Sequence, residues 1–181
     1  MSLRLKQGLL FGGFFLLLVM VPFLGFHDEH EDAIISAQAD VTQSTFPIQS
    51  FELVDLEGER TTIDEYFGQP MVINFFATWC GPCEAEMPMF EEYADQLQGE
   101  VTFIGINSGE SSKDVSAFVK RIGVTFGVYL DSDNQIVRQF LVRALPTTLF
   151  IDRDGALAAK HIGILTPELM DGYLEEIGID Q

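Results

Sequence analysis

Residues 72–83 read Val-Ile-Asn-Phe-Phe-Ala-Thr-Trp-Cys-Gly-Pro-Cys and give the strongest local indication of the fold class. Its first part belongs to a nearly continuous apolar run over 71–77, which is typical of a β-strand buried on both faces. A helix is predicted to begin just after Cys80 and to run to about Gln98. Cys80 and Cys83, the two cysteines of the chain, therefore lie where a buried strand gives way to a helix.

The spacing of this cysteine pair favours redox chemistry. A helix N-terminus carries about half a positive charge and unpaired N–H groups, which stabilise the thiolate form of cysteine. Cys80, the first of the pair, is therefore expected to be the nucleophile, with a lowered pKa. Cys83 lies one helical turn further on, so its sulfur can reach Cys80 and form a disulfide. Because so short a loop hardly constrains the unfolded chain, redox exchange explains this disulfide better than stability does.

From Phe51 onward the chain alternates predicted strands and helices. Hydrophobic periodicity and turn residues predict strands at 51–54, 60–63, 101–107, 127–130, 147–151 and 156–162, and helices at 114–122, 134–142 and 167–177. This order indicates an α/β domain with an open sheet and helices on both faces. The last two strands form a hairpin, so we expect the sheet to be partly antiparallel.

The first 26 residues are of a different kind. Arg4 and Lys6 precede residues 8–26, which carry no charge and match the roughly 20 apolar residues that cross a bilayer as a helix. Basic charge before the span and acidic charge after it place the N-terminus in the cytoplasm. We therefore predict a cytoplasmic N-terminus at 1–7, a transmembrane signal-anchor at 8–26, an acidic and polar tether at 27–50, and an extracytoplasmic domain at 51–181.

A cleaved signal peptide is the alternative to a permanent anchor. Residues 37–39, Ala-Gln-Ala, fit the small-x-small cleavage pattern, but they lie 13 residues beyond Phe26 across a highly charged stretch. That distance favours the anchor. The predicted location is therefore the cell membrane, crossed once.

Composition excludes several function classes. The net charge is −18, from 10 basic and 28 acidic residues, and it repels phosphate backbones, so nucleic-acid binding is excluded. A hydrophobic content of 47% is too high for a disordered acidic protein. Because Arg4 and Lys6 are the only charged residues before position 27, the exported part carries −20. This charge has two explanations, solubility near a like-charged membrane surface and the attraction of basic partners.

Four stretches together resemble the thioredoxin superfamily, and more narrowly the membrane-anchored TlpA/ResA type of extracytoplasmic thiol-disulfide oxidoreductases. They are 51–53 with the hairpin glycine Gly58, 72–83, Glu-Met-Pro at 86–88, and Leu-Pro-Thr-Thr-Leu-Phe-Ile-Asp at 145–152. The resemblance implies a thioredoxin-like three-layer α/β fold with a central mixed β-sheet, an N-terminal β-hairpin extension and a central insertion. It implies a redox-active Cys80–Cys83 disulfide and neither a further cofactor nor a metal.

The resemblance also assigns roles beside the cysteines. Pro146 matches a cis-proline that would leave the backbone of Leu145 free to pair with an extended substrate segment. Glu86 matches a glutamate that could take the proton of Cys83, in place of the buried aspartate of cytoplasmic thioredoxins. Asn74 holds the position of that aspartate, and an amide cannot take the proton. A solvated glutamate on the helix surface is the alternative for Glu86.

Trp79, Gly81 and Pro82 complete the predicted active-site stretch. Trp79 is expected to shield the disulfide and to contact substrates, with core packing as the alternative. Gly-Pro between the cysteines is the pair found in thioredoxin, whose potential is about −270 mV, so a reductant is predicted. In similar proteins the substrate is often the Cys-x-x-Cys-His of an apocytochrome c before haem attachment, and a membrane thiol-disulfide protein donates the electrons. Spore-envelope and disulfide-repair roles also occur among them.

Two other functions compete with this one. A copper-delivering protein on the same fold would use Cys80, Cys83 and the distant His161 as soft ligands, although such proteins usually have three residues between the cysteines. A thiol peroxidase would use Cys80 as the peroxidatic thiol, with Thr78 and an arginine beside it. The short spacing of the cysteines argues against the large rearrangement that such an enzyme needs.

Overall fold

The computed structural model describes residues 47–180. The predicted cytoplasmic segment, the transmembrane span and most of the tether lie outside these residues. The elements in chain order are β1 (Glu52–Val54), β2 (Arg60–Thr62), η1 (Ile63–Tyr66), β3 (Met71–Phe76), α2 (Gly81–Gln96), β4 (Thr102–Ser108), α3 (Ser112–Ile122), β5 (Gly127–Asp131), α4 (Gln135–Gln139), β6 (Thr147–Ile151), β7 (Leu157–Ile162) and α5 (Pro167–Glu176). No helix within 47–180 has the length and apolar character needed to span a membrane.

A five-stranded mixed sheet with the order β5-β4-β3-β6-β7 forms the centre of the domain. β4 is parallel to β3 and to β5, whereas β6 is antiparallel to both β3 and β7. The predicted mixed sheet is therefore confirmed. The predicted N-terminal hairpin is also present, as a separate antiparallel pair of β1 and β2 whose turn contains Gly58 at φ +91°.

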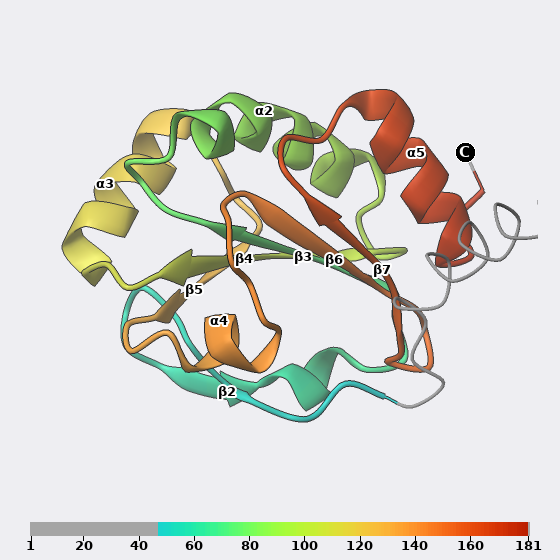
Figure 1. Cartoon of the computed structure of the whole chain (residues 1–181), viewed down its shortest axis with the longest axis horizontal. Coiled ribbons are helices and arrows are strands. Elements are labelled where there is room, and N and C mark those ends of the chain that lie inside the picture. The colour runs from blue at the N-terminus through green and yellow to red at the C-terminus, as the bar shows by residue number, and fades with distance from the viewer. Residues whose placement is uncertain (1–46, 181) are drawn as a thin grey trace, which may run out of the picture.

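The sheet lies between two other layers. Helices α2, α3 and α5 cover one face, while α4, η1 and the β1-β2 hairpin cover the other (Figure 1). Every residue of β3 is buried, and side chains alternate between the faces: Ile73 and Phe75 join the cluster beneath the hairpin, and Val72 and Phe76 join clusters beneath the helices. β3 is thus the buried central strand that the apolar run predicted. Because α2 begins five residues after β3 ends, β3 also sets the position of the start of α2.

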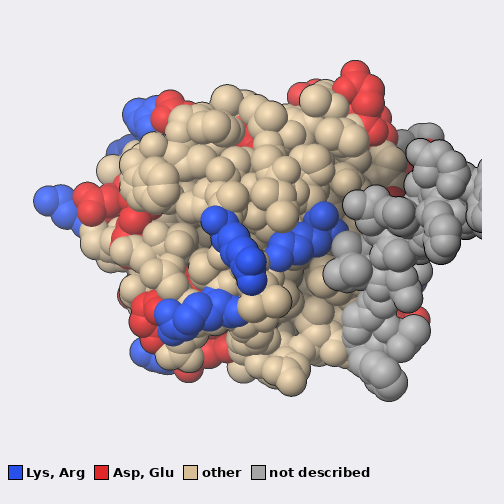
Figure 2. All heavy atoms as spheres, in the orientation of Figure 1, with Lys and Arg blue, Asp and Glu red and all other residues tan. Residues whose placement is uncertain are grey.

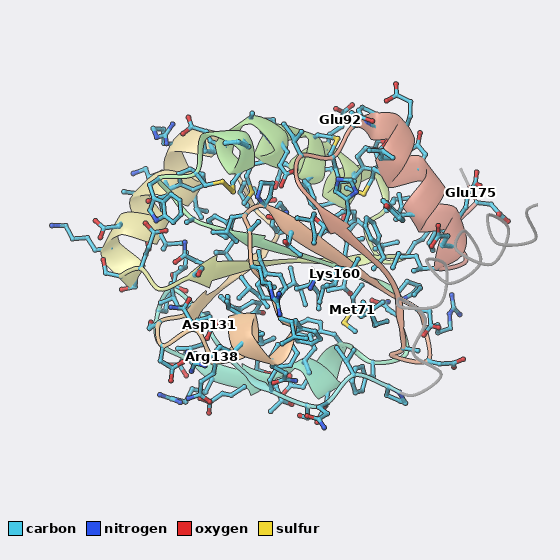
Figure 3. The ribbon with its side chains drawn as sticks, viewed as in Figure 1. Met71, Glu92, Asp131, Arg138, Lys160 and Glu175 are labelled. Carbon is cyan, nitrogen blue, oxygen red and sulfur yellow. A yellow bond between two sulfur atoms is a disulfide. The ribbon has the colours of Figure 1, made fainter. Side chains whose placement is uncertain are left out.

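The helix α4 is shorter than predicted. It was expected over 134–142 but ends at Gln139, because Leu141 adopts a left-handed φ of +50°. The Val142 N–H then bonds back to the Val137 carbonyl across the reversed residue. Lys160 on β7 donates to the carbonyls of Phe140 and Leu141 at this helix end (Figure 3). The predicted end was wrong because the apolar periodicity of the sequence continues past the residue at which the backbone turns.

Residues 47–50, assigned to the tether above, already lie against the domain. Pro47 forms a β-bridge with Ala156, and the Ile48 N–H donates to the Gly155 carbonyl at 2.8 Å. Gln139 on α4 donates its side-chain amide to the Gln49 carbonyl. The packed part of the chain therefore begins before position 51.

Candidate active site

Cys80 and Cys83 lie at the start of α2, at the carboxyl end of β3. They form a disulfide, visible as a yellow bond in Figure 3, with a Cα–Cα distance of 5.2 Å. Cys80 is the N-cap of α2, and its sulfur accepts a 3.3 Å hydrogen bond from the Cys83 N–H. This N–H and the helix dipole would stabilise a Cys80 thiolate after reduction. Cys83 is fully buried and Cys80 is 5% exposed, so Cys80 is the one that a substrate can reach.

The residues next to the disulfide in the sequence are exposed to solvent, so a substrate can approach it. Trp79 is 73% exposed, so the core-packing alternative for it is wrong. Gly81 and Pro82 are exposed as well, in the first turn of α2. The disulfide therefore lies just under a surface whose largest apolar side chain is Trp79.

The loop before β6 packs against the cysteines. The Leu145–Pro146 peptide bond has the cis geometry that the resemblance implies, and Pro146 is buried. Leu145 packs against the cluster that contains both cysteines. The Pro146 carbonyl accepts from the Gly163 N–H at 2.9 Å, whereas the backbone of Leu145 makes no hydrogen bond within residues 47–180. A free backbone at this point can pair with an extended chain.

Glu86 is buried, so the surface alternative for it is wrong. It lies one helical turn after Cys83 on α2 and is 2% exposed. Its carboxylate accepts from the Asn74 side-chain amide at 2.9 Å and from the Leu165 N–H at 3.0 Å. Burial raises the pKa of Glu86 to about 7, although both hydrogen bonds work against this rise. A carboxyl group with such a pKa can exchange a proton at neutral pH.

Asn74 on β3 is part of the same buried group. Its side-chain NH₂ donates both to Glu86 and to the Thr148 hydroxyl, the latter at 3.1 Å. Its carbonyl oxygen Oδ1 is buried and has no partner among residues 47–180. Thr148 and Leu165 were not predicted as site residues. Leu165 contributes only its backbone, which leaves no trace in the side-chain pattern.

Glu110 is a second site residue that was not predicted. Its carboxylate accepts from the N–H and the hydroxyl of Thr78 and from the side-chain amide of Asn107. With Asp114, Phe118 and Arg121, Thr78 and Glu110 line a hollow of about 380 Å³ beside the active-site loop. Glu110 follows β4 as Cys80 follows β3, and carboxyl ends of neighbouring parallel strands meet at one edge of a sheet. That relation could have identified it from the sequence.

His161 and Thr78, which the two competing functions would use beside the cysteines, form hydrogen bonds with other residues. The ring of His161 contacts the Tyr173 hydroxyl and the Ile164 carbonyl. Residues 47–180 contain no group of three His, Cys, Asp or Glu side chains that could hold a metal ion, so Cys80, Cys83 and His161 are not gathered into one copper site. The Thr78 hydroxyl, which a peroxidase would turn toward Cys80, donates to Glu110.

The comparisons with known proteins agree with this geometry. The AhpC/TSA family matches residues 45–160. A thiol-disulfide oxidoreductase ResA of Geobacillus kaustophilus is 33% identical over 90% of this chain and 92% of its own length. One of Bacillus cereus is 36% identical over 71% of this chain and 75% of its own length. The chain belongs to the ResA-like thiol-disulfide oxidoreductases of the AhpC/TSA family.

A solved structure supports the same assignment for this ResA-like enzyme. StoA from Bacillus subtilis superposes with a TM-score of 0.61 at 25% identity, over 70% of this chain and 96% of that one. The predicted thioredoxin-like fold and the predicted thiol-disulfide oxidoreductase activity are therefore confirmed. In a ResA-like enzyme the paired cysteines are the expected redox centre, with Cys80 outermost and Cys83 beneath it.

Proposed function

We propose that this ResA-like enzyme is an extracytoplasmic reductant of exported protein disulfides, with the Cys-x-x-Cys disulfide of an apocytochrome c, before haem attachment, as its substrate. The observation that carries the proposal is the pairing of a Cys80–Cys83 disulfide at a helix N-terminus with a buried Glu86 one turn further on. This arrangement supplies a nucleophile, a resolving thiol and a proton acceptor in sequence.

The reducing direction rests on the residues between the cysteines. Gly81 and Pro82 are neutral and offer no side-chain donor to stabilise a thiolate beyond what the helix supplies. The strong oxidant DsbA owes its high potential of about −120 mV to a stabilised reduced form, whereas the potential of thioredoxin is about −270 mV. The Gly-Pro pair therefore supports a low potential.

The proposed reaction moves two electrons from the cysteines to the substrate. The Cys80 thiolate attacks one sulfur of the substrate disulfide; a Cys80–substrate disulfide forms, and the second substrate sulfur leaves as a thiolate. Glu86 takes the proton of Cys83. The Cys83 thiolate then attacks the Cys80 sulfur, which breaks the mixed disulfide and closes the Cys80–Cys83 disulfide seen in the structure. Glu86 returns its proton to the departing substrate thiolate.

The surface around Pro146 suits an extended polypeptide. Ile162 is 59% exposed and Ile164 is 48% exposed, on either side of the Gly163 N–H that bonds to Pro146. Trp79 is exposed beside the disulfide. Apolar side chains around a free backbone segment favour an unfolded substrate, because a folded one keeps its own backbone groups paired.

Location and partners complete the proposal. The apolar span at 8–26 would hold the enzyme in the cell membrane, close to a membrane thiol-disulfide protein that reduces Cys80–Cys83 after each turnover. The charge of −20 beyond the span would attract basic substrates, and Glu110 and Asp114 place part of it beside the active-site loop. Figure 2 shows Lys and Arg side chains in the middle of the face that it draws and Asp and Glu side chains mainly toward its edges, so the charge is unevenly distributed over that face.

Trapping experiments test the roles of the two cysteines. The full-length chain, purified in detergent, is mixed with a peptide that contains an oxidised Cys-x-x-Cys-His. Cys83→Ala is expected to accumulate a mixed disulfide with the peptide, because nothing resolves it, whereas Cys80→Ala should accumulate none. Equal accumulation by both variants would contradict the assignment. A peptide with serines in place of its cysteines is the control for non-covalent association.

A further inference from the structure

The hydrogen bonds of the buried Asn74 side chain have no role in the reaction described above. Asn74 is fully buried, its NH₂ group has two partners, and its carbonyl oxygen Oδ1 has none among residues 47–180. A buried polar atom without a partner costs free energy, so its retention calls for a reason. The two partners of the NH₂ group, Glu86 and Thr148, suggest one.

The hydrogen bonds of Glu86 suit an ionised carboxylate. Its two oxygens accept from the Asn74 NH₂ and from the Leu165 N–H, and both donors are satisfied. When Glu86 takes a proton on the oxygen that faces Asn74 and its O–H points toward the amide, the O–H meets the NH₂ group, and two donors face each other. A half-turn of the amide removes this conflict. Oδ1 then accepts from the Glu86 O–H, and the Thr148 hydroxyl changes from acceptor to donor toward Oδ1.

The two arrangements contain the same number of hydrogen bonds. In the first, NH₂ donates to Glu86 and to Thr148; in the second, Oδ1 accepts from both. The hydroxyl of Thr148 is what makes the exchange possible, because a hydroxyl both donates and accepts. An aspartate at position 74 would lack the donor that an ionised Glu86 needs.

We propose that Asn74 is a positioning residue that serves Glu86 in both protonation states, donating to its carboxylate and, after a half-turn of the amide, accepting from its carboxyl O–H. The inference rests on the proposed role of Glu86. The proton passes from the Cys83 sulfur to Glu86, and Asn74 neither gains nor loses one. Because the hydrogen bond to the carboxylate is charge-assisted and the bond from the carboxyl O–H is not, Asn74 still favours the ionised Glu86, but by less than an NH₂ group that could not turn.

Among the neighbours that hydrogen-bond Glu86, only Asn74 can change from donor to acceptor. Leu165 contributes a backbone N–H from the loop between β7 and α5, which can only donate. Cys83 is the titratable neighbour on α2, and β3 and β6 contribute the neutral Asn74 and Thr148. His161, paired with Thr148 across β6 and β7, directs its ring to Tyr173 and Ile164. The Asn74 hydrogen bond lowers the pKa of Glu86 against the larger effect of burial.

A pH profile separates this role from a structural one. In the full-length chain in detergent, the rate at which Cys83 resolves a mixed disulfide with the test peptide is followed from pH 5 to pH 9. Asn74→Leu is expected to raise the midpoint of the profile by about one pH unit, which makes resolution at pH 7 about fivefold slower. Thr148→Val should raise it by less, and Thr148→Ser, which keeps the hydroxyl, should leave it unchanged. A uniform loss of rate at every pH, with an unmoved midpoint, would overturn the inference.

Nuclear magnetic resonance tests the half-turn directly and needs no substrate. The Asn74 side-chain amide signals are recorded while the oxidised wild-type chain is titrated. They are assigned by their absence in Asn74→Leu or, if that variant does not fold, by selective labelling. They are expected to shift with Glu86. In Glu86→Gln, whose NH₂ mimics the carboxyl O–H, they should match the acidic form at every pH. Signals that do not respond would overturn the half-turn. If Glu86→Gln resolves mixed disulfides as the wild type does, the role of Glu86 fails, while the amide signals still report on Asn74.

Discussion

Glu110 accepts hydrogen bonds from both the backbone N–H and the hydroxyl of Thr78, at 2.7 and 2.5 Å. Thr78 lies two residues before Cys80, and Glu110 lies in the loop that follows β4. The pair therefore fixes the active-site loop to the neighbouring strand of the sheet, while Asn107 adds a third hydrogen bond to the same carboxylate. The position of Cys80 depends on these hydrogen bonds of Glu110 as well as on α2.

Removal of these hydrogen bonds should destabilise the domain. Glu110→Ala deletes three charge-assisted hydrogen bonds and leaves the donors of Thr78 and Asn107 unpaired, so we expect the free energy of unfolding to fall by about 1–3 kcal/mol. Chemical denaturation of the oxidised protein measures this change. Glu100→Ala, at an exposed position, is the matched control and should change it by less than about 0.5 kcal/mol. A Glu110→Ala variant as stable as the control would show that these hydrogen bonds contribute nothing.

Glu86 should make stability depend on pH. Its pKa in the folded protein is about 7, above its ordinary value of 4.5, so between these pH values the folded state holds a proton that the unfolded state has lost. The free energy of unfolding should therefore be highest below about pH 4.5 and fall as the pH rises through 7, by about 3 kcal/mol in all from this group.

Glu86→Gln is the test of that dependence. Denaturation at a series of pH values from 5 to 8 should show the fall in the wild type and a flatter profile in Glu86→Gln, because the amide does not titrate. Glu175→Gln, exposed on α5, should retain the wild-type profile. Parallel profiles for wild type and Glu86→Gln would refute the raised pKa.

Trp79 should matter for substrates and hardly at all for folding. Because 73% of it is exposed, Trp79→Ala is expected to change the free energy of unfolding by less than about 0.5 kcal/mol. Its rate of mixed-disulfide formation with the oxidised peptide should fall severalfold, because a large contact beside Cys80 is lost. Phe76→Ala, in the core against Phe118, should instead cost about 3–5 kcal/mol. An unchanged rate for Trp79→Ala would remove Trp79 from the substrate surface.

Lys160 should stabilise the turn that follows α4. Its ammonium group donates to the carbonyls of Phe140 and Leu141 at the helix end, and burial lowers its pKa, with Arg143 nearby adding to the effect. Lys160→Met keeps the apolar stem and deletes both hydrogen bonds, so we expect a loss of about 1–2 kcal/mol by chemical denaturation. Lys120→Met, exposed on α3, serves as the comparison. Equal stability of the two variants would mean that the helix end needs no lysine.

Local patterns in the sequence predicted most of the fold and the centre of the site. The apolar run at 71–77 predicted β3, and the change of pattern at Cys80 predicted the start of α2 within a residue. The redox role of Cys80 and Cys83 was predicted from their spacing and their place at the start of a helix. The end of α4 was wrong because a single left-handed residue, Leu141, stops a helix without interrupting its apolar periodicity.

Contacts between distant segments could not be read in this way. Whether Glu86 is buried depends on Leu165, which lies 79 residues away and contributes only a backbone N–H. The same holds for Thr148, which reaches Asn74 through the pairing of β3 and β6. The sequence indicated a glutamate of the right spacing, and only the packing of the β7–α5 loop onto α2 decides that its pKa is raised.

The reduction potential of the Cys80–Cys83 pair determines whether this enzyme reduces or oxidises its substrates. The full-length chain in detergent is equilibrated in dithiothreitol or glutathione buffers of known poise, and the fraction of reduced protein is measured by thiol alkylation. A reductant of exported disulfides requires a value near that of thioredoxin, about −270 mV or lower. A value of about −120 mV would contradict the reducing role, because the enzyme would then introduce disulfides into exported proteins.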